Sequence, residues 1–125
     1  MTIRELQAAA HANSVNHGWW DQQRRIALTP EGEDLDKRLV LATIPEKLCL
    51  VHSEVSEALE DYRDGTMITV VNNDGKPEGF PSELADILIR LLDLCGALGI
   101  DLETEVEIKM AYNATRPYRH GGKAC

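Results

Sequence analysis

The sequence predicts an all-α protein built like a four-helix bundle, with a small β-hairpin or loop between the second and third long helices. Four stretches carry apolar residues at the helical period. Each stretch is followed by a residue that stops a helix: Gly18, Gly65, Gly99 and Pro117. The 125 residues match one domain, so we expect a single domain over residues 1–125 that ends in a flexible tail, 116–125.

The first half of the chain pairs a helix with a polar segment. Residues 2–17 are predicted to be helical, because Ile3, Leu6 and Val15 recur near the helical period. Residues 21–38 are polar and include a Thr-Pro-Glu-Gly turn signal. We therefore expect a loop there, with at most one helical turn.

The second helix is predicted to begin at Thr43 or Ile44, because Pro45 suits a first turn. It should run to about Arg63, and Gly65 should end it. Its expected buried stripe consists of Leu48, Val51, Val55, Ala58, Leu59 and Tyr62.

The second half of the chain combines one β-like stretch with two helices. Residues 67–75 join a short β-branched run to a turn, which favours a small hairpin or an irregular loop. A lone hairpin is marginal, so it should lean on the helices or on a partner chain. Ser82 is the expected N-cap of a helix over about 83–98, and Asp101 that of the last helix, over about 102–115.

The third helix carries the sharpest functional signal. Glu83, Asp86, Arg90 and Asp93 lie along one stripe of a helix that is otherwise apolar nearly all round and is therefore expected to be buried. Buried carboxylates are costly unless something compensates their charge. Arg90 can pair with one or two of these acids, so a divalent cation is the natural remaining partner.

The second helix offers complementary ligands. Glu54 and Glu57 are three residues apart, so two antiparallel helices would present four carboxylates around one point: Glu54, Glu57, Glu83 and Asp86. Carboxylates without His or Cys favour Mg²⁺, or Mn²⁺, over zinc. The plainer alternative is a solvated face, which is the usual role of a lone E-x-x-E pair.

The last helix carries candidate phosphate contacts. Lys109, Tyr112 and Arg116 share one stripe, with Asn113 adjacent. Cations beside a bound metal can hold phosphate oxygens. The alternative is an ordinary surface pair between Glu105 and Lys109.

Aromatic and imidazole side chains near the first helix add weaker candidates. Trp19 and Trp20 follow a helix stop, and one of them can stack on a base. The alternative is a plug under the loop or at a subunit contact. His11, His17 and His52 have no carboxylate partner identifiable from spacing, so we interpret them as structural.

Composition excludes several classes of function. A net charge of -8 argues against binding to duplex nucleic acid. The apolar stretches are shorter than the ~20 residues that span a bilayer, and the N-terminus lacks a signal-peptide pattern, so we expect a cytoplasmic protein without membrane contact. Three cysteines without C-x-x-C spacing fit that expectation, with Cys49 and Cys95 as core thiols.

Three motifs occur in order along the chain: H-S-E-V-S-E-A-L-E at 52–60, E-L-A-D-I at 83–87 and K-M-A-Y-N-A-T-R at 109–116. Together they resemble the MazG-like branch of the all-α nucleoside triphosphate pyrophosphohydrolase superfamily. The family pattern is E-x-x-E, a variable gap and E-x-x-D, and the gap here spans 58–82. Several members double the first acid, whereas Ser53 stands there in this chain, which affects outer-shell bonding or the identity of the base.

The resemblance implies cleavage of a nucleoside triphosphate between its α- and β-phosphates, giving the monophosphate and pyrophosphate. It implies Mg²⁺ held by Glu54, Glu57, Glu83 and Asp86, with Glu54 or Glu57 as the base. The implied ligand contacts are Lys109, Tyr112, Asn113, Arg116, one of Trp19 and Trp20, and Arg119 or Lys123 from the tail. It also implies a homodimer or homotetramer, which a nearly all-apolar helix in so small a chain favours independently.

Two other classes compete with this interpretation. A di-iron or di-manganese carboxylate bundle normally adds Glu-x-x-His pairs, and none occurs here. A non-catalytic helical interaction module would use its acids only for solubility, and Mg²⁺ would then leave melting unchanged. The preferred base and sugar are left open by the sequence.

Overall fold

A computed structural model describes residues 1–22 and 32–118 of the protein, with the side chains of 32–40 left out. Over these residues the chain forms four helices and one hairpin, which confirms the predicted fold class. The predicted flexibility of the tail falls mostly on residues 119–125, outside the described residues. In chain order the elements are α1 (Ile3–Asn16), α3 (Gly32–Asp64), β1 (Val70–Val71), β2 (Pro77–Glu78), α4 (Phe80–Leu98) and α5 (Leu102–Thr115).

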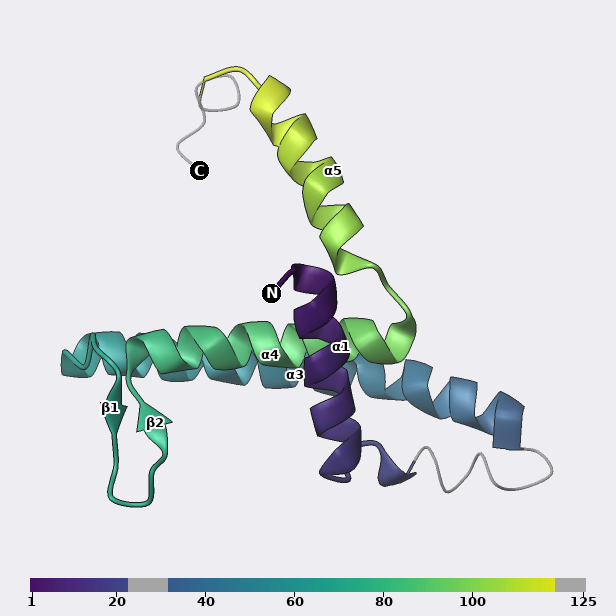
Figure 1. The fold of residues 1–125 in the computed structure, drawn as a ribbon, viewed down its shortest axis with the longest axis horizontal. Helices are drawn as coiled ribbons and strands as arrows, with labels where there is room; N and C mark the ends of the chain where they lie inside the picture. The colour runs from purple at the N-terminus through teal and green to yellow at the C-terminus, as the bar shows by residue number, and fades with distance from the viewer. Residues whose placement is uncertain (23–31, 119–125) are drawn as a thin grey trace.

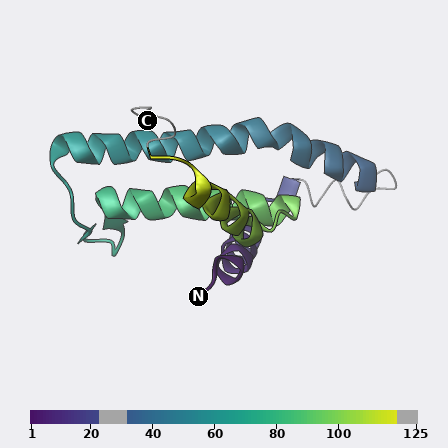
Figure 2. The same cartoon turned by 90° about the horizontal axis from the view of Figure 1, so that it is seen from above.

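Helix α4 is the middle layer of the molecule. It lies antiparallel beside α3, and α1 crosses it on the opposite side (Figures 1 and 2). The buried apolar side chains gather at this double contact: Leu92, Leu94 and Cys95 of α4, with Ala58 and Trp20. All-round burial of α4 was expected, and it is wrong for the N-terminal half, where Leu84 and Leu88 are exposed because α1 does not reach them.

Helix α1 begins with a capping box and approaches α4 very closely. The Thr2 hydroxyl accepts a hydrogen bond from the backbone N–H of Glu5, and the Glu5 carboxylate accepts one from the backbone N–H of Thr2. At the crossing, a Cβ added to Gly96 would lie 2.5 Å from the Cβ of His11. A glycine is therefore required at Gly96 for the two helices to touch.

Helix α3 is longer than the sequence predicts. It begins at Gly32, so a predicted start at Thr43 or Ile44 and a predicted loop over 21–38 are both wrong where the structure describes them. Pro45 lies inside the helix, and α3 curves through its N-terminal half (Figure 2). The missed signal is the run E-D-L-D-K-R-L-V-L-A from Glu33, in which acids precede bases among strong helix formers.

The face that α3 turns toward α4 also differs from the expected stripe. Glu54 and Ala58 are buried there, whereas Leu48, Val55, Leu59 and Tyr62 are exposed. The expected stripe is therefore wrong in most of its members, because the described part of the chain covers only one side of α3. The exposed residues Leu41, Leu48, Val55 and Tyr62 recur every seven positions, and we call this set the heptad stripe.

The hairpin and the start of α4 are organised by turn residues. Val70 pairs with Glu78 in the antiparallel ladder, which confirms the predicted hairpin. A Cβ at Gly79 (φ 111°) would lie 2.2 Å from the carbonyl oxygen of Ile68, so this position needs glycine. Gly79 is the N-cap of α4, and the prediction of Ser82 is wrong because its hydroxyl donates to the carbonyl of Pro77 instead.

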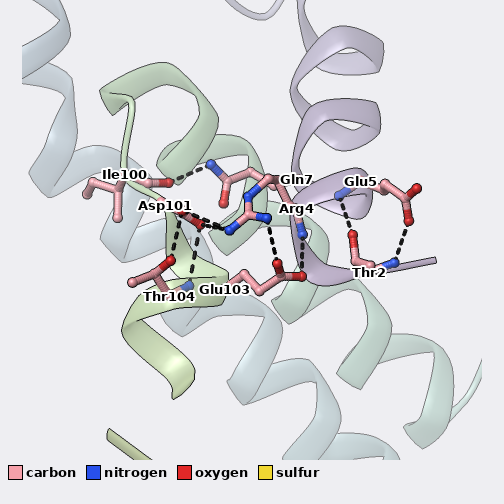
Figure 3. Close-up of polar contacts among 8 residues, drawn as sticks. All are labelled: Thr2, Arg4, Glu5, Gln7, Ile100, Asp101, Glu103 and Thr104. Atoms are coloured by element: carbon pink, nitrogen blue, oxygen red, sulfur yellow. Dashed lines mark hydrogen bonds and ion pairs between the residues drawn. The ribbon is translucent and has the colours of Figure 1, made fainter. Parts of the chain in front are cut away.

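Helix α5 is attached to the rest of the chain at its N-terminal end. Asp101 caps it, as predicted, by accepting from the backbone N–H and the hydroxyl of Thr104. Arg4 of α1 binds Asp101 at 2.9 Å and Glu103 at 2.9 Å (Figure 3). Beyond this junction α5 extends away from the α3–α4 pair, and none of its residues is buried (Figure 1).

Two expectations on environment are also addressed by the described residues. No helix among them has the length and apolar character needed to cross a membrane. Cys95 is a buried free thiol, as expected, but Cys49 is exposed, because it lies on the side of α3 that α4 leaves uncovered.

Candidate metal centre and adjoining pocket

Three carboxylates converge between α3 and α4. One oxygen each from Glu54, Glu57 and Glu83 lies within 4.8 Å of the others. Glu54 and Glu57 come from successive turns of α3, and Glu83 comes from the first turn of the antiparallel α4. The convergence expected from the two motifs is therefore confirmed for these three residues.

Asp86 lies one turn further along α4, beside this cluster. It faces the adjoining pocket together with Glu54, and its charge acts on Glu83. The structure does not include Asp86 in the three-carboxylate group. Its predicted role as a fourth ligand stays a prediction.

The carboxyl groups of Glu83 and Glu54 share a proton through a hydrogen bond. Burial, a hydrogen bond with Glu54 and the charges of Glu57, Asp86 and Glu54 together raise the pKa of Glu83 to about 7, and burial contributes most. The oxygens of three carboxylates are the donors that a hard divalent cation takes in proteins. Such a cation would replace the shared proton.

Arg90 contacts the cluster through an ion pair with Glu54. Its Nε donates to the Glu54 carboxylate at 2.6 Å, so Arg90 pairs with an acid of α3, whereas pairing with acids of its own helix was expected. The Arg90 side chain is 42% exposed, whereas that of Glu54 is 10% exposed. Arg90 thus reaches from the glutamate cluster to the pocket beside it.

A pocket of about 450 Å³ opens next to the cluster, which is a common size for a small-molecule site. It lies between α1, α3 and α4, and its lining mixes charged, amide and apolar groups. One end carries Glu54, Asp86 and Arg90. The rest is lined by Ala10, Asn13, Ser14, Trp19, Glu46, Lys47, Leu50, Ile89 and Asp93.

The two tryptophans have different environments. Trp19 lines the pocket and is 69% exposed, so its ring is available to a ligand. Trp20 is 4% exposed, with Lys47 Nζ 4.5 Å from its ring centroid and the His11 ring against it edge-on. A base-stacking role for Trp20 is therefore wrong, and the interpretation as a plug fits it.

Asp93 joins α4 to α1 through two hydrogen bonds and to Trp20, beyond the end of α1, through a third. Its Oδ1 lies 2.8 Å from His11 Nδ1 and accepts from Trp20 Nε1 at 3.0 Å, and its Oδ2 accepts from the Ser14 hydroxyl at 2.8 Å. The expectation that His11 lacks a carboxylate partner is wrong. The sequence did contain a signal for this contact. His11 and Ser14 are polar residues three positions apart on α1, and Asp93 is an acid on an otherwise apolar helix that needs partners.

The predicted phosphate contacts on α5 are not beside the carboxylates within one chain. Lys109 and Arg116 lie near the Tyr112 ring, at 5.9 and 5.8 Å from its centroid. These residues and Asn113 are exposed on the part of α5 that extends away (Figure 1). The expectation that these residues lie beside the glutamate cluster is therefore wrong within the single chain. Their role as phosphate ligands stays a prediction. Arg119 and Lys123 lie outside the described residues.

Comparison with models of protein families, with curated proteins and with solved structures finds no match to this chain. The likeness to the MazG-like branch therefore rests on the three motifs.

Proposed function

We propose that the protein is a Mg²⁺-dependent pyrophosphohydrolase that converts a (deoxy)nucleoside triphosphate and water into the monophosphate and pyrophosphate. One observation carries the proposal: three carboxylates from two helices converge beside a pocket of about 450 Å³, and one of them, Glu54, also lines that pocket. The carboxylates could bind a metal that holds phosphates, and the Trp19 ring in the same pocket could stack on a base. This arrangement suits a nucleotide, which has phosphates at one end and a base at the other.

The donor set fits the proposed cation. Glu54, Glu57 and Glu83 would hold Mg²⁺, or Mn²⁺ in its place, with Asp86 completing the set. When bound, the metal neutralises phosphate oxygens and lowers the pKa of a water molecule. Holding the cation also offsets the repulsion that raises the pKa of Glu83.

The side chains around the metal divide the remaining tasks. Glu57 is exposed, whereas Glu54 is held by Arg90, so Glu57 is the better base for the water that attacks the α-phosphorus. The new bond forms from that water oxygen, the bond to the bridging oxygen breaks, and pyrophosphate leaves. Arg90, at the pocket wall, is placed to hold a phosphate oxygen.

Self-association, as a homodimer or homotetramer, is part of the proposal. The heptad stripe leaves Leu41, Leu48, Val55 and Tyr62 between 45% and 63% exposed, and apolar residues at this spacing are typical of helix pairing. A second copy would cover this stripe. It is also the available source of Lys109 and Arg116 for the phosphates, since α5 extends away from its own cluster.

The association is tested by light scattering. We expect a mass of at least two chains for the native protein, and a lower mass for Val55→Lys at the same concentration. Ser56→Lys is the matched control, because Ser56 is also exposed on α3 but lies outside the stripe. A native mass of one chain at every concentration would reject this part of the proposal.

The activity is tested with a panel of ribo- and deoxyribonucleoside triphosphates, with and without Mg²⁺, and with separation of the products. We expect the monophosphate and pyrophosphate only with Mg²⁺. Glu57→Gln should abolish turnover, while Glu60→Gln, an exposed position that pairs with Arg63 on the same helix, should not. If no triphosphate is cleaved and Mg²⁺ leaves melting unchanged, the interaction-module hypothesis replaces this one.

A further inference from the structure

We infer that the end of the pocket away from the three glutamates selects a base with an exocyclic amino group, such as cytosine or adenine, and that Asp93 is the selecting residue. The inference rests on the proposed function for the presence of a nucleotide. It goes further by naming the class of base and the side chain that recognises it.

The unused hydrogen-bonding capacity of Asp93 is the first step. An ionised carboxylate offers about four acceptor positions, two on each oxygen. Among the residues that the structure describes, Oδ1 has two partners, His11 and Trp20, while Oδ2 has one, the hydroxyl of Ser14. One acceptor position on Oδ2 therefore remains, and Asp93 lines the pocket.

The immobility of this carboxylate is the second step. Its side chain is 14% exposed and is held by groups from both α1 and the Trp20 segment. A fixed, partly buried acceptor can accept from an N–H of a ligand without rearranging. It cannot turn away from a ligand carbonyl, so a keto oxygen facing it would leave two acceptors unpaired.

The surrounding wall also matches the edge and face of a base. Asn13 adds an amide with one donor and one acceptor group, and Glu46 adds a further acceptor. Trp19 presents its exposed ring, while Leu50 and Ile89 supply apolar contacts. At the position that Asp93 reads, the acceptor that remains on Oδ2 favours an amino group over a keto group.

Matched ligands test the inference without relying on turnover. Titration calorimetry with Mg²⁺ would compare dCMP with dUMP and dAMP with dIMP, which differ by an amino group in place of a keto oxygen. We expect the amino member of each pair to bind at least about tenfold more tightly, as one base-specific contact of 1–3 kcal/mol requires. Equal affinity within both pairs, or no binding of any of the four, would overturn the inference.

Variants assign the preference to Asp93. Asp93→Asn should bring the ratio of the two affinities close to one, because the amide can turn its donor toward a keto oxygen. Glu60→Gln is the control, since Glu60 is exposed on α3, pairs with Arg63 and does not line the pocket; its ratio should stay at the native value. An unchanged ratio in a folded Asp93→Asn protein, checked by circular dichroism, would contradict the role of Asp93.

If Asp93→Asn does not fold, the two ligand pairs on the native protein still decide whether the preference exists, and Asn13→Ala then tests the wall. We expect Asn13→Ala to weaken binding of both members of a pair while the preference for the amino member persists. Loss of the preference in Asn13→Ala would place the selection at Asn13 and overturn the role of Asp93. Failure of the proposed function has a different signature, since no triphosphate would then be cleaved, whichever monophosphates bind.

Discussion

Helix α4 buries carboxylates in two regions, and the cost of burying them is offset differently in each. Near its C-terminal half, Asp93 accepts hydrogen bonds from the Ser14 hydroxyl and the Trp20 indole and lies 2.8 Å from a His11 nitrogen. At its N-terminal end, Glu83 has other carboxylates for neighbours, and its pKa is raised to about 7. Burying a carboxylate is costly in both places, but only the first has fixed donors.

This difference indicates that Asp93 contributes mainly to stability, whereas Glu83 is available to bind a cation. An acid that accepts from several fixed donors stabilises one arrangement of helices, and its removal leaves those donors unpaired. An acid that depends on a shared proton can exchange that proton for a cation. The comparison therefore predicts that Asp93 substitutions change stability, whereas substitutions in the glutamate cluster change metal binding and turnover.

The largest expected effect is on turnover. Glu83→Gln removes a negative oxygen from the metal-ligand cluster, and we expect a decrease in kcat/KM of at least about 100-fold. Without metal the variant should melt at the same temperature or higher, because the amide mimics the protonated acid and relieves repulsion with Glu57. The measurement is initial-rate kinetics with Mg²⁺, beside a thermal melt in chelator. A variant that turns over normally but melts far lower would reverse the comparison.

The second effect is on stability. Asp93→Ala leaves the Ser14 hydroxyl, the Trp20 indole and a His11 nitrogen without their acceptor, and each unpaired buried group costs about 1–3 kcal/mol. We expect the free energy of unfolding in urea to fall by about 3 kcal/mol or more. Asp74→Ala, in the exposed hairpin turn, is the matched control. Equal unfolding curves for the two variants would show that Asp93 does not hold α1 on α4.

Much of the fold could be predicted because its signals are local. A few neighbouring residues determine each of these signals, namely the helix stops at Gly18 and Gly99, the Asp101 cap and the turn within the hairpin. The start of α3 could not be placed by the same rule, because Pro45 suits a first turn equally well and lies within a longer helix. Which side of α3 is buried depends on what covers it, and that is a tertiary property.

The candidate site was predicted only in part for the same reason. Spacing on two helices was enough to bring Glu54, Glu57 and Glu83 together once the helices were antiparallel. The direction of α5, which carries Lys109 and Arg116 away from the cluster, depends on the Arg4 junction and has no counterpart in local spacing.

The third effect is on the pH dependence of metal binding. Because the pKa of Glu83 is about 7, the acid carries a proton below that pH, and the proton must leave when the cation binds. The apparent affinity for Mg²⁺ should therefore fall by about tenfold for each pH unit below 7 and level off above it. Calorimetry in buffers of different ionisation enthalpy should detect release of close to one proton at pH 6. Binding that is independent of pH from 5 to 8 would contradict the shared proton.

The same group contributes to stability with the opposite sign. Its pKa is raised from 4.5 in the unfolded chain to about 7 in the fold, so the folded state binds the proton more tightly. Its contribution to the free energy of unfolding is fully present below about pH 4.5 and is lost as the pH rises to about 7. Melting in chelator should show this loss in the native protein, and Glu83→Gln should lack it.

The smallest effect concerns a third kind of acid, one that is paired but exposed. Asp101 binds Arg4, and that hydrogen bond and the one from Thr104 lower the pKa of Asp101. Exposed ion pairs contribute little to stability because water and salt screen them, so Arg4→Ala should leave the global unfolding free energy unchanged. It should instead speed hydrogen exchange in the first turn of α5, since Arg4 and Gln7 link α1 to the residues that begin that helix (Figure 3). Lys76→Ala is the control, because Lys76 is a cation of the hairpin turn that takes no part in this junction.

If Arg4→Ala lost as much global stability as Asp93→Ala, burial would not explain the difference between Asp93 and Asp101 in their contribution to stability.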